Sequence, residues 1–252
     1  NRSYWSILNI TTKKQNHLHG HMQENLVKYN IPYLRDSTLV LLDTGRGMIA
    51  GYLMWLFAAS SIQTMSSEIS EEAMTGTMEQ VCLSPPGPIC ILLARTISGV
   101  LFSFISLPIV YYILQILTGI YLEINLWSIL PILILTFFGM CGFGFILAGI
   151  TLVFKRIGLL LDLIPLILFG LAMLPIETLP NNLQIFSLTF PLTLGVKLVR
   201  LILLKEQSLI HLLKNGEILL LFLNSSFYFL VGIFGYKIAD KIARDRGLLG
   251  HY

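Results

Sequence analysis

The chain has 252 residues, of which 55% are hydrophobic and 12% are charged, and its formal net charge is +3. A soluble domain carries about 25% charged residues, so this composition excludes a fold that covers its surface with polar groups. The small net charge and the scattered basic residues argue against nucleic acid as a partner. The long apolar runs instead predict an all-α integral membrane protein, because backbone groups that face lipid must be hydrogen-bonded within their own helix.

Membrane lipid is therefore the first expected partner, and five segments are apolar enough to cross it, which takes about 20 residues each. We expect these spans at about 47–66, 90–118, 125–154, 157–176 and 217–238. The stretch between the last two, 179–208, is apolar but interrupted by prolines. We expect it to form a re-entrant or interfacial hairpin on the outer side.

Small residues gather in the third expected span. They are Gly139, Gly142, Gly144 and Ala148. Side chains this small let another helix approach closely. A packing seam and a functional hinge both fit the pattern, and we favour the seam.

Basic residues next to the span ends indicate the topology. If the hairpin does not cross, the pair Lys155 and Arg156 and the basic tail at 237–246 share one face with the loop at 67–89. Basic residues beside spans are usually retained in the cytoplasm. We therefore expect this face and the C-terminus to be cytoplasmic, in a plasma or inner membrane.

This topology divides the chain into three regions. We expect a polar extracytoplasmic segment at 1–40, a transmembrane domain at 41–246 and a cytoplasmic tail at 247–252. To account for an outer start without a signal peptide, we expect a first transmembrane helix upstream of Asn1, which would give six spans in the full protein. The run His17, His19 and His21 alternates like metal ligands, but isolated loop histidines rarely bind metal, and we expect no metal site.

The loop between the first two spans has the most distinctive polar pattern. Residues 66–88, SSEISEEAMTGTMEQVCLSPPGP, contain four glutamates and no basic residue. At helical spacing Glu68, Glu72, Thr75 and Glu79 share one face, which predicts a short acidic amphipathic helix. Gly76 interrupts this helix, and the prolines at its end stop it because proline lacks the N–H donor. A solvated connecting loop and a docking helix both fit these residues.

The same loop resembles a motif of the type-two ATP-binding-cassette (ABC-2) exporter permeases, which reads Glu, Gly-Thr, Glu, Ser-Pro. Together with the neighbouring Glu71, the residues concerned are Glu71, Glu72, Gly76, Thr77, Glu79, Ser84 and Pro85. A second similarity lies before the last span, in the proline-rich outer hairpin of that family. Its residues here are Pro180, Pro191, Thr193 and Arg200. The resemblance covers about 45–240.

The resemblance implies a transport subunit that is not itself an enzyme. In that family the loop forms a coupling helix that docks on a cytoplasmic ATP-binding cassette subunit, and two permeases, identical or paralogous, enclose the path. ATP and Mg would bind to the partner subunit, and this chain lacks a GxxxxGKS/T loop, so we expect no cofactor on it. Asp162 in the fourth span could line the path or turn back towards the interface. The alternatives are a channel, an anchoring subunit without ATP coupling and a membrane-embedded enzyme.

Overall fold

The structure, a computed structural model, describes residues 32–75, 77, 80–81, 84–85, 87–122, 125–154, 158–174, 180–205 and 207–245. These residues form helices joined by turns, without a strand among them, and this confirms the expected all-α fold. The helices are α2 (Pro32–Thr75), α4 (Gly87–Thr118), α5 (Leu126–Val153), α6 (Gly158–Met173), α7 (Asn181–Thr189), α8 (Pro191–Lys205), α9 (Leu209–Lys214) and α10 (Glu217–Asp245). Most of the expected extracytoplasmic segment and the expected tail lie outside the described residues.

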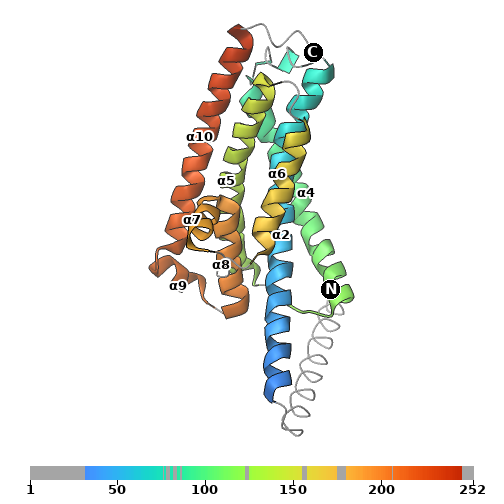
Figure 1. Cartoon of the computed structure of the whole chain (residues 1–252). Helices are drawn as coiled ribbons and strands as arrows, with labels where there is room; N and C mark the ends of the chain where they lie inside the picture. Colours follow the sequence, from blue (N-terminus) through green and yellow to red (C-terminus); the bar gives the residue numbers. More distant parts are fainter. Residues whose placement is uncertain are drawn as a thin grey trace.

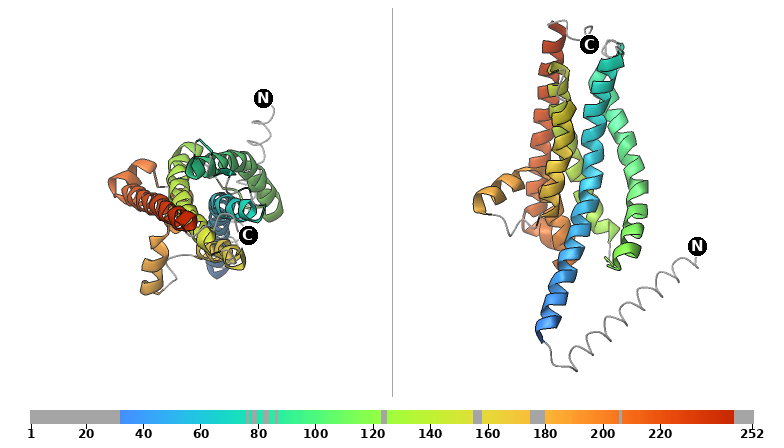
Figure 2. Two further views of the ribbon diagram at one scale, coloured as in Figure 1. Left: turned by 90° about the horizontal axis from the view of Figure 1, so that it is seen from above. Right: turned by 45° about the vertical axis from the view of Figure 1, so that its right-hand side comes forward.

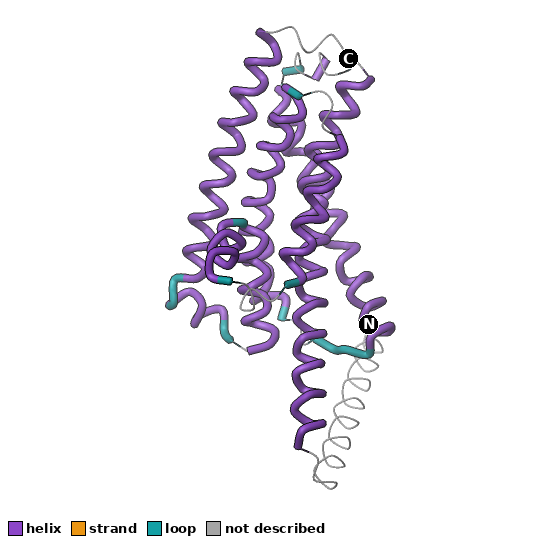
Figure 3. The backbone as a smooth tube through the Cα atoms, in the orientation of Figure 1, coloured by secondary structure: helices purple, strands orange, loops and turns teal. Residues whose placement is uncertain are grey.

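The long helices run along one common axis and alternate in direction (Figure 1; Figure 2). We call the upper end the part of the bundle where α2, α5 and α10 end and where α4 and α6 begin. The opposite part is the lower end, and α7, α8 and α9 lie on this side of the bundle (Figure 3). The loop after α2, the end of α5 and the end of α10 therefore share one end, which is the arrangement that a non-crossing hairpin predicts.

Four of the described helices are long and apolar enough to cross a membrane. The stretches are Leu42–Met65, Gly87–Thr118, Trp127–Val153 and Glu217–Asp245. They match the first, second, third and fifth expected spans, and the chain is a multi-pass membrane protein. The fourth expected span corresponds to α6, which has 16 residues and so falls short of the about 20 that a perpendicular crossing takes. The count of five spans stays a prediction.

The interior of the bundle is formed mainly by α2 and α5. In their most apolar windows, 56% of the residues of α2 and 50% of those of α5 are buried, against 17% in α4 and 22% in α10. The outward faces of α4 and α10 carry large apolar side chains such as Phe102, Leu117 and Phe227, which are 71%, 75% and 63% exposed. Helices that are apolar on all sides belong in a membrane or in a large core, so lipid or another subunit is expected to cover these faces.

The small residues of α5 let three other helices approach its backbone. A Cβ added at Gly139 would meet the Pro191 side chain of α8 at 2.5 Å, and one at Gly144 would meet Met65 Sδ of α2 at 2.8 Å. A Cβ at Gly142 would collide with the backbone of α10. The expected packing role of these residues is confirmed, and it serves three neighbours because the glycines point in different directions around the helix.

Helix α6 is attached to α2 by an aromatic cluster. Trp55 Nε1 donates a hydrogen bond of 2.8 Å to the carbonyl oxygen of Pro165. The rings of Trp55 and Phe169 meet edge to face with centroids 4.9 Å apart, a geometry that aromatic pairs prefer. These contacts place the second half of α6 beside the middle of α2.

Helix α8 packs into the bundle, although it carries the charged residues Lys197 and Arg200. Pro191, Leu192, Thr193, Leu194 and Val196 are all buried. Pro191 begins the helix, where its missing N–H is tolerated, and it packs against Gly139 in the middle of α5. The expected hairpin therefore corresponds to α7 and α8, while its depth in a bilayer stays a prediction.

We predict that Gly232→Ala destabilises the protein and that Gly235→Ala, three residues later on the same helix, does not. A Cβ at Gly232 would collide with the carbonyl oxygen of Gly142, whereas nothing lies within 4 Å of a Cβ at Gly235. Overpacking of this kind costs about 1–3 kcal/mol, while alanine gains up to about 1 kcal/mol over glycine in a helix. Thermal unfolding of the two purified variants in detergent measures the difference. Equal melting temperatures would contradict the backbone contact between α5 and α10.

Candidate functional site

As far as Thr75, the acidic segment after the first span is part of α2 and not a separate helix. Helix α2 has 44 residues and continues beyond the apolar stretch Leu42–Met65 to Thr75. The expectation of a short independent helix starting at about residue 66 was therefore wrong. The physical reason is that no glycine or proline lies between Gly51 and Gly76, so nothing in the sequence breaks the helix before Gly76.

The C-terminus of α2 is capped by two threonines, Thr75 and the motif residue Thr77. The Thr77 N–H donates a bond of 3.0 Å to the Glu72 carbonyl, five residues back. Such a bond is typical of a Schellman cap, which favours glycine at the intervening position, and the sequence has Gly76 there. The Thr75 hydroxyl donates to the Glu71 carbonyl at 2.8 Å and lies 2.9 Å from the Thr77 hydroxyl. Thr77 thus has a structural role at the end of the helix.

Two of the acidic residues are bound to a single arginine on α4. Arg95 Nη1 lies 2.6 Å from Glu72 Oε1 and 2.8 Å from Glu68 Oε2. The Glu72 side chain is only 11% exposed, whereas that of Arg95 is 42% exposed. A carboxylate with so little access to water needs a paired charge. Glu72 is therefore held against α4 and does not project into solvent.

The sequence contains a signal for this ion pair that lies outside the motif. Arg95 is the only charged residue between Gly87 and Thr118, and a lone charge in an apolar helix usually has a partner nearby. Glu68 and Glu72 lie four residues apart and so share one face of α2. A cation close to the start of the next helix is a natural partner for such a pair.

The remaining motif residues have different environments. Glu71 is exposed. Ser84 is partly buried, and its hydroxyl donates to the Val81 carbonyl at 2.7 Å, while Pro85 is exposed. Gly87 has a φ of +73°, a conformation that glycine adopts without strain, and its N–H closes a turn on Ser84 at 3.0 Å. Gly76 and Glu79 lie outside the described residues.

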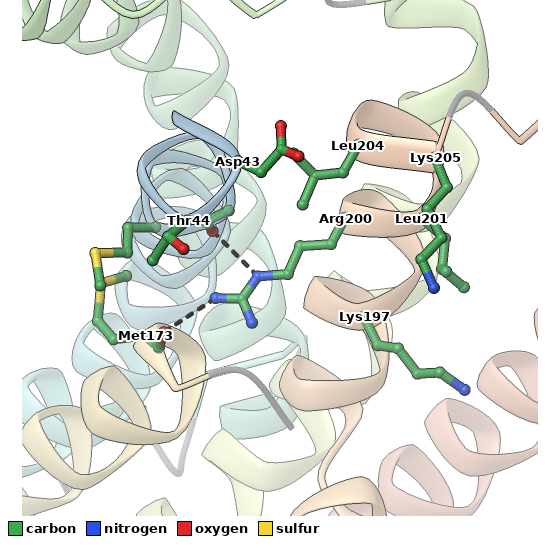
Figure 4. A pocket seen from close by; sticks show the side chains of 10 residues that line it. Asp43, Thr44, Met173, Lys197, Arg200, Leu201, Leu204 and Lys205 are labelled. Carbon is green, nitrogen blue, oxygen red and sulfur yellow. Dashed lines mark hydrogen bonds between the residues drawn. The ribbon is translucent and has the colours of Figure 1, made fainter. Parts of the chain in front are cut away.

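A second polar cluster surrounds Arg200 at the lower end. Its Nε donates to the Gly47 carbonyl of α2 at 3.1 Å. Nη1 donates to the Leu174 carbonyl at 2.9 Å, and Nη2 donates to those of Ala172 and Met173 at 2.7 and 3.2 Å. Figure 4 shows the guanidinium between α2 and the end of α6. Arg200 therefore joins three helices through backbone oxygens.

The guanidinium of Arg200 supplies hydrogen-bond donors to the carbonyl oxygens at the C-terminal end of α6. The last carbonyls of a helix lack partners within it, and a cation near the C-terminus interacts favourably with the helix dipole. The fit is tight, because a Cβ at Gly51 would collide with the Ala172 carbonyl and lie 2.9 Å from Arg200 Nη2. Arg200 is thus a cap for a helix that ends inside the bundle.

A cavity of about 230 Å³ lies beside Arg200. It is lined by Asp43, Thr44, Gly47, Met48, Met173, Lys197, Arg200, Leu201, Leu204 and Lys205. Lys197 pairs with Glu217 of α10 at 3.3 Å, and in Figure 4 the two lysines point away from the guanidinium. The cations therefore do not converge on one point in the cavity.

The other predicted residues are placed as follows. Thr193 is buried in α8, and Pro180 is exposed before α7. Asp162 belongs to α6, but its side chain lies outside the described part of the structure. Among the described residues there is no group of three or more His, Cys, Asp and Glu side chains that could hold a metal. The three histidines near the N-terminus lie outside the residues described.

Comparison with known protein families gives a match over most of the chain. The family model described as ABC-2 type transporter matches residues 18–204. This range includes both polar clusters. No curated protein and no solved structure matches the chain.

We predict that Arg200→Gln lowers thermal stability and that Lys205→Gln, on the same helix, has little effect. The first change leaves backbone carbonyls without their donor, and a lost hydrogen bond from a charged group costs about 1.5–3 kcal/mol. For a chain of this size 1 kcal/mol corresponds to about 2–4 °C. Lys205 is exposed, so the loss of its charge should change the free energy of unfolding little. Melting curves in detergent decide the matter, and an unchanged melting temperature in Arg200→Gln would contradict the capping role.

Proposed function

Because the chain belongs to the ABC-2 type transporter family, we propose that it is the permease subunit of an ABC exporter. It moves a substrate outward with energy from ATP that a separate nucleotide-binding subunit hydrolyses. In this proposal the upper end and the C-terminus face the cytoplasm of a cell whose plasma or inner membrane holds the bundle.

The observation that carries the proposal is the acidic extension of α2. The helix continues past its apolar stretch Leu42–Met65 for about 10 residues, or roughly 15 Å at 1.5 Å per residue. It ends in a hydrogen-bonded cap at Thr77. A stiff, capped helix end outside the apolar stretch is suited to receive a push from a docked subunit. The following segment, 76–86, is the expected contact.

Within the acidic extension of α2, the exposed Glu71 is the best placed of the described acids to meet a partner. Glu72 already pairs with Arg95, whereas Glu71 is exposed. Exposed ion pairs contribute only about 0–1 kcal/mol each. Their role would be to orient the nucleotide-binding subunit, and most of the affinity would come from other contacts. Glu79 stays a predicted contact because it belongs to the motif that resembles the coupling helix.

A second permease copy, identical or paralogous, would complete the substrate path. Large apolar and aromatic side chains fill the interior of the described bundle; they include Phe57, Phe145, Met65 and Tyr236. Such close packing leaves little room for a substrate within one chain. The apolar outer faces of α4 and α10 offer surfaces for the second copy and for lipid.

We predict that the chain forms a complex with an ATP-binding cassette subunit from the same organism. The two proteins should co-purify from detergent in equal amounts, and the complex should hydrolyse ATP. A partner whose phosphate-binding lysine is replaced by alanine should still co-purify but lose hydrolysis. If neither this partner nor any other ATP-binding cassette subunit binds when co-expressed, the exporter assignment is wrong.

We also predict that Glu71→Lys lowers ATP hydrolysis by the complex several-fold while the chain still inserts into the membrane. The reversed charge would repel a basic docking groove on the partner. Glu71→Gln, which only removes the charge, should have a smaller effect. Lys214→Glu reverses an exposed charge at the lower end and should leave hydrolysis unchanged. Equal rates in all of these variants would exclude Glu71 from the contact.

A further inference from the structure

The contact between α2 and α4 has a regular register in the upper half of the bundle. Glu68 of α2 faces Arg95 of α4. One helical turn lower a Cβ at Gly99 would lie 3.3 Å from Thr64 Oγ1. One turn lower again, Ser103 donates to the Ser60 hydroxyl at 3.1 Å. The two helices thus meet at every fourth residue, as antiparallel helices in close contact do.

The contacts differ in strength from top to bottom. The ion pairs of Arg95 with Glu68 and Glu72 are short and charged, whereas the pairs below them involve hydroxyl groups or van der Waals contact. Hydrogen bonds between charged groups are about twice as strong as neutral ones. Towards the lower end, α4 separates from α2 in both side views (Figure 1; Figure 2). The strongest link between the helices therefore lies next to segment 76–86, which connects them.

We propose that Arg95 is a positioning residue that makes the upper halves of α2 and α4 move as one rigid unit when ATP drives the docked subunit. This inference rests on the proposed function, because it concerns the response to a force that enters at segment 76–86. With Arg95 in place, the two helices keep their register during the cycle. Without it, the force on the loop separates them and is not transmitted to the rest of the bundle.

A disulfide cross-link between α2 and α4 tests the inference without knowledge of the substrate. The hydroxyls of Ser60 and Ser103 are 3.1 Å apart, so Ser60→Cys and Ser103→Cys place two sulfur atoms near bonding distance. The native Cys82, Cys90 and Cys141 are replaced by serine or alanine in this background. The cross-linked fraction is measured in the complex with the ATP-binding subunit, with and without a non-hydrolysable ATP analogue.

We expect the analogue to leave the cross-linked fraction unchanged when Arg95 is present. In Arg95→Gln the cross-linked fraction without nucleotide should equal that of the parent protein. The analogue should then lower this fraction at least two-fold. Arg95→Lys keeps the charge but lacks the planar fork that binds two carboxylates, so it should give an intermediate loss. The double variant Arg95→Glu/Glu72→Arg rebuilds the ion pair with its charges reversed. Its cross-linked fraction should therefore again be independent of the analogue.

The possible failures are distinguishable. If Arg95→Gln hydrolyses ATP and cross-links equally with and without the analogue, the inference is overturned and the exporter assignment stands. The same holds if the charge exchange does not restore the parent behaviour. If Arg95→Gln does not fold, Arg95→Lys decides, and a nucleotide-independent cross-link in that variant overturns the inference. A chain that binds no ATP-binding subunit overturns both proposals.

Discussion

Polar groups inside an apolar bundle must find partners within the protein, and two arginines meet this requirement here. Arg95 neutralises the carboxylates at the upper end of α2. Arg200 satisfies the carbonyl oxygens where α6 ends at the lower end. In water such groups would be solvated, but within an apolar environment an unpaired charge or carbonyl is costly. Both arginines therefore contribute to the arrangement of α4, α6 and α8 around α2.

The glycines of α5 and α10 provide a different kind of contact. Gly142 and Gly232 bring the two backbones together, and packing of this type depends on shape and not on charge. The α5–α10 pair is consequently tight along an apolar seam, while α2 and α4 are joined by polar groups near one end. The bundle thus combines one helix pair that van der Waals contact holds with another whose firmest link is an ion pair.

The sequence predicts some of these features and not others, for identifiable reasons. Apolar length is a local property, so four spans, the glycine seam of α5 and the stop of α2 at Gly76 could be expected from the residues alone. The length of α2 differs from the expectation because a change from apolar to acidic composition does not end a helix when no glycine or proline breaks it. The partner of Glu72 depends on the register between α2 and α4. The spacing of residues within either helix does not determine this register. The acceptors of Arg200 are backbone carbonyls, which every residue has, and so no side-chain pattern identifies them.

Helix α2 connects the two polar clusters directly. It contacts Arg95 through Glu68 and Glu72 near its upper end, and it accepts a hydrogen bond from Arg200 at Gly47. An unbroken helix between Gly47 and Glu72 is roughly 37 Å long at 1.5 Å per residue. The same helix therefore meets the ion pairs of the acidic extension near its upper end and the Arg200 cluster of the hairpin nearer its lower end, so one continuous element of the fold connects the acidic extension with the hairpin.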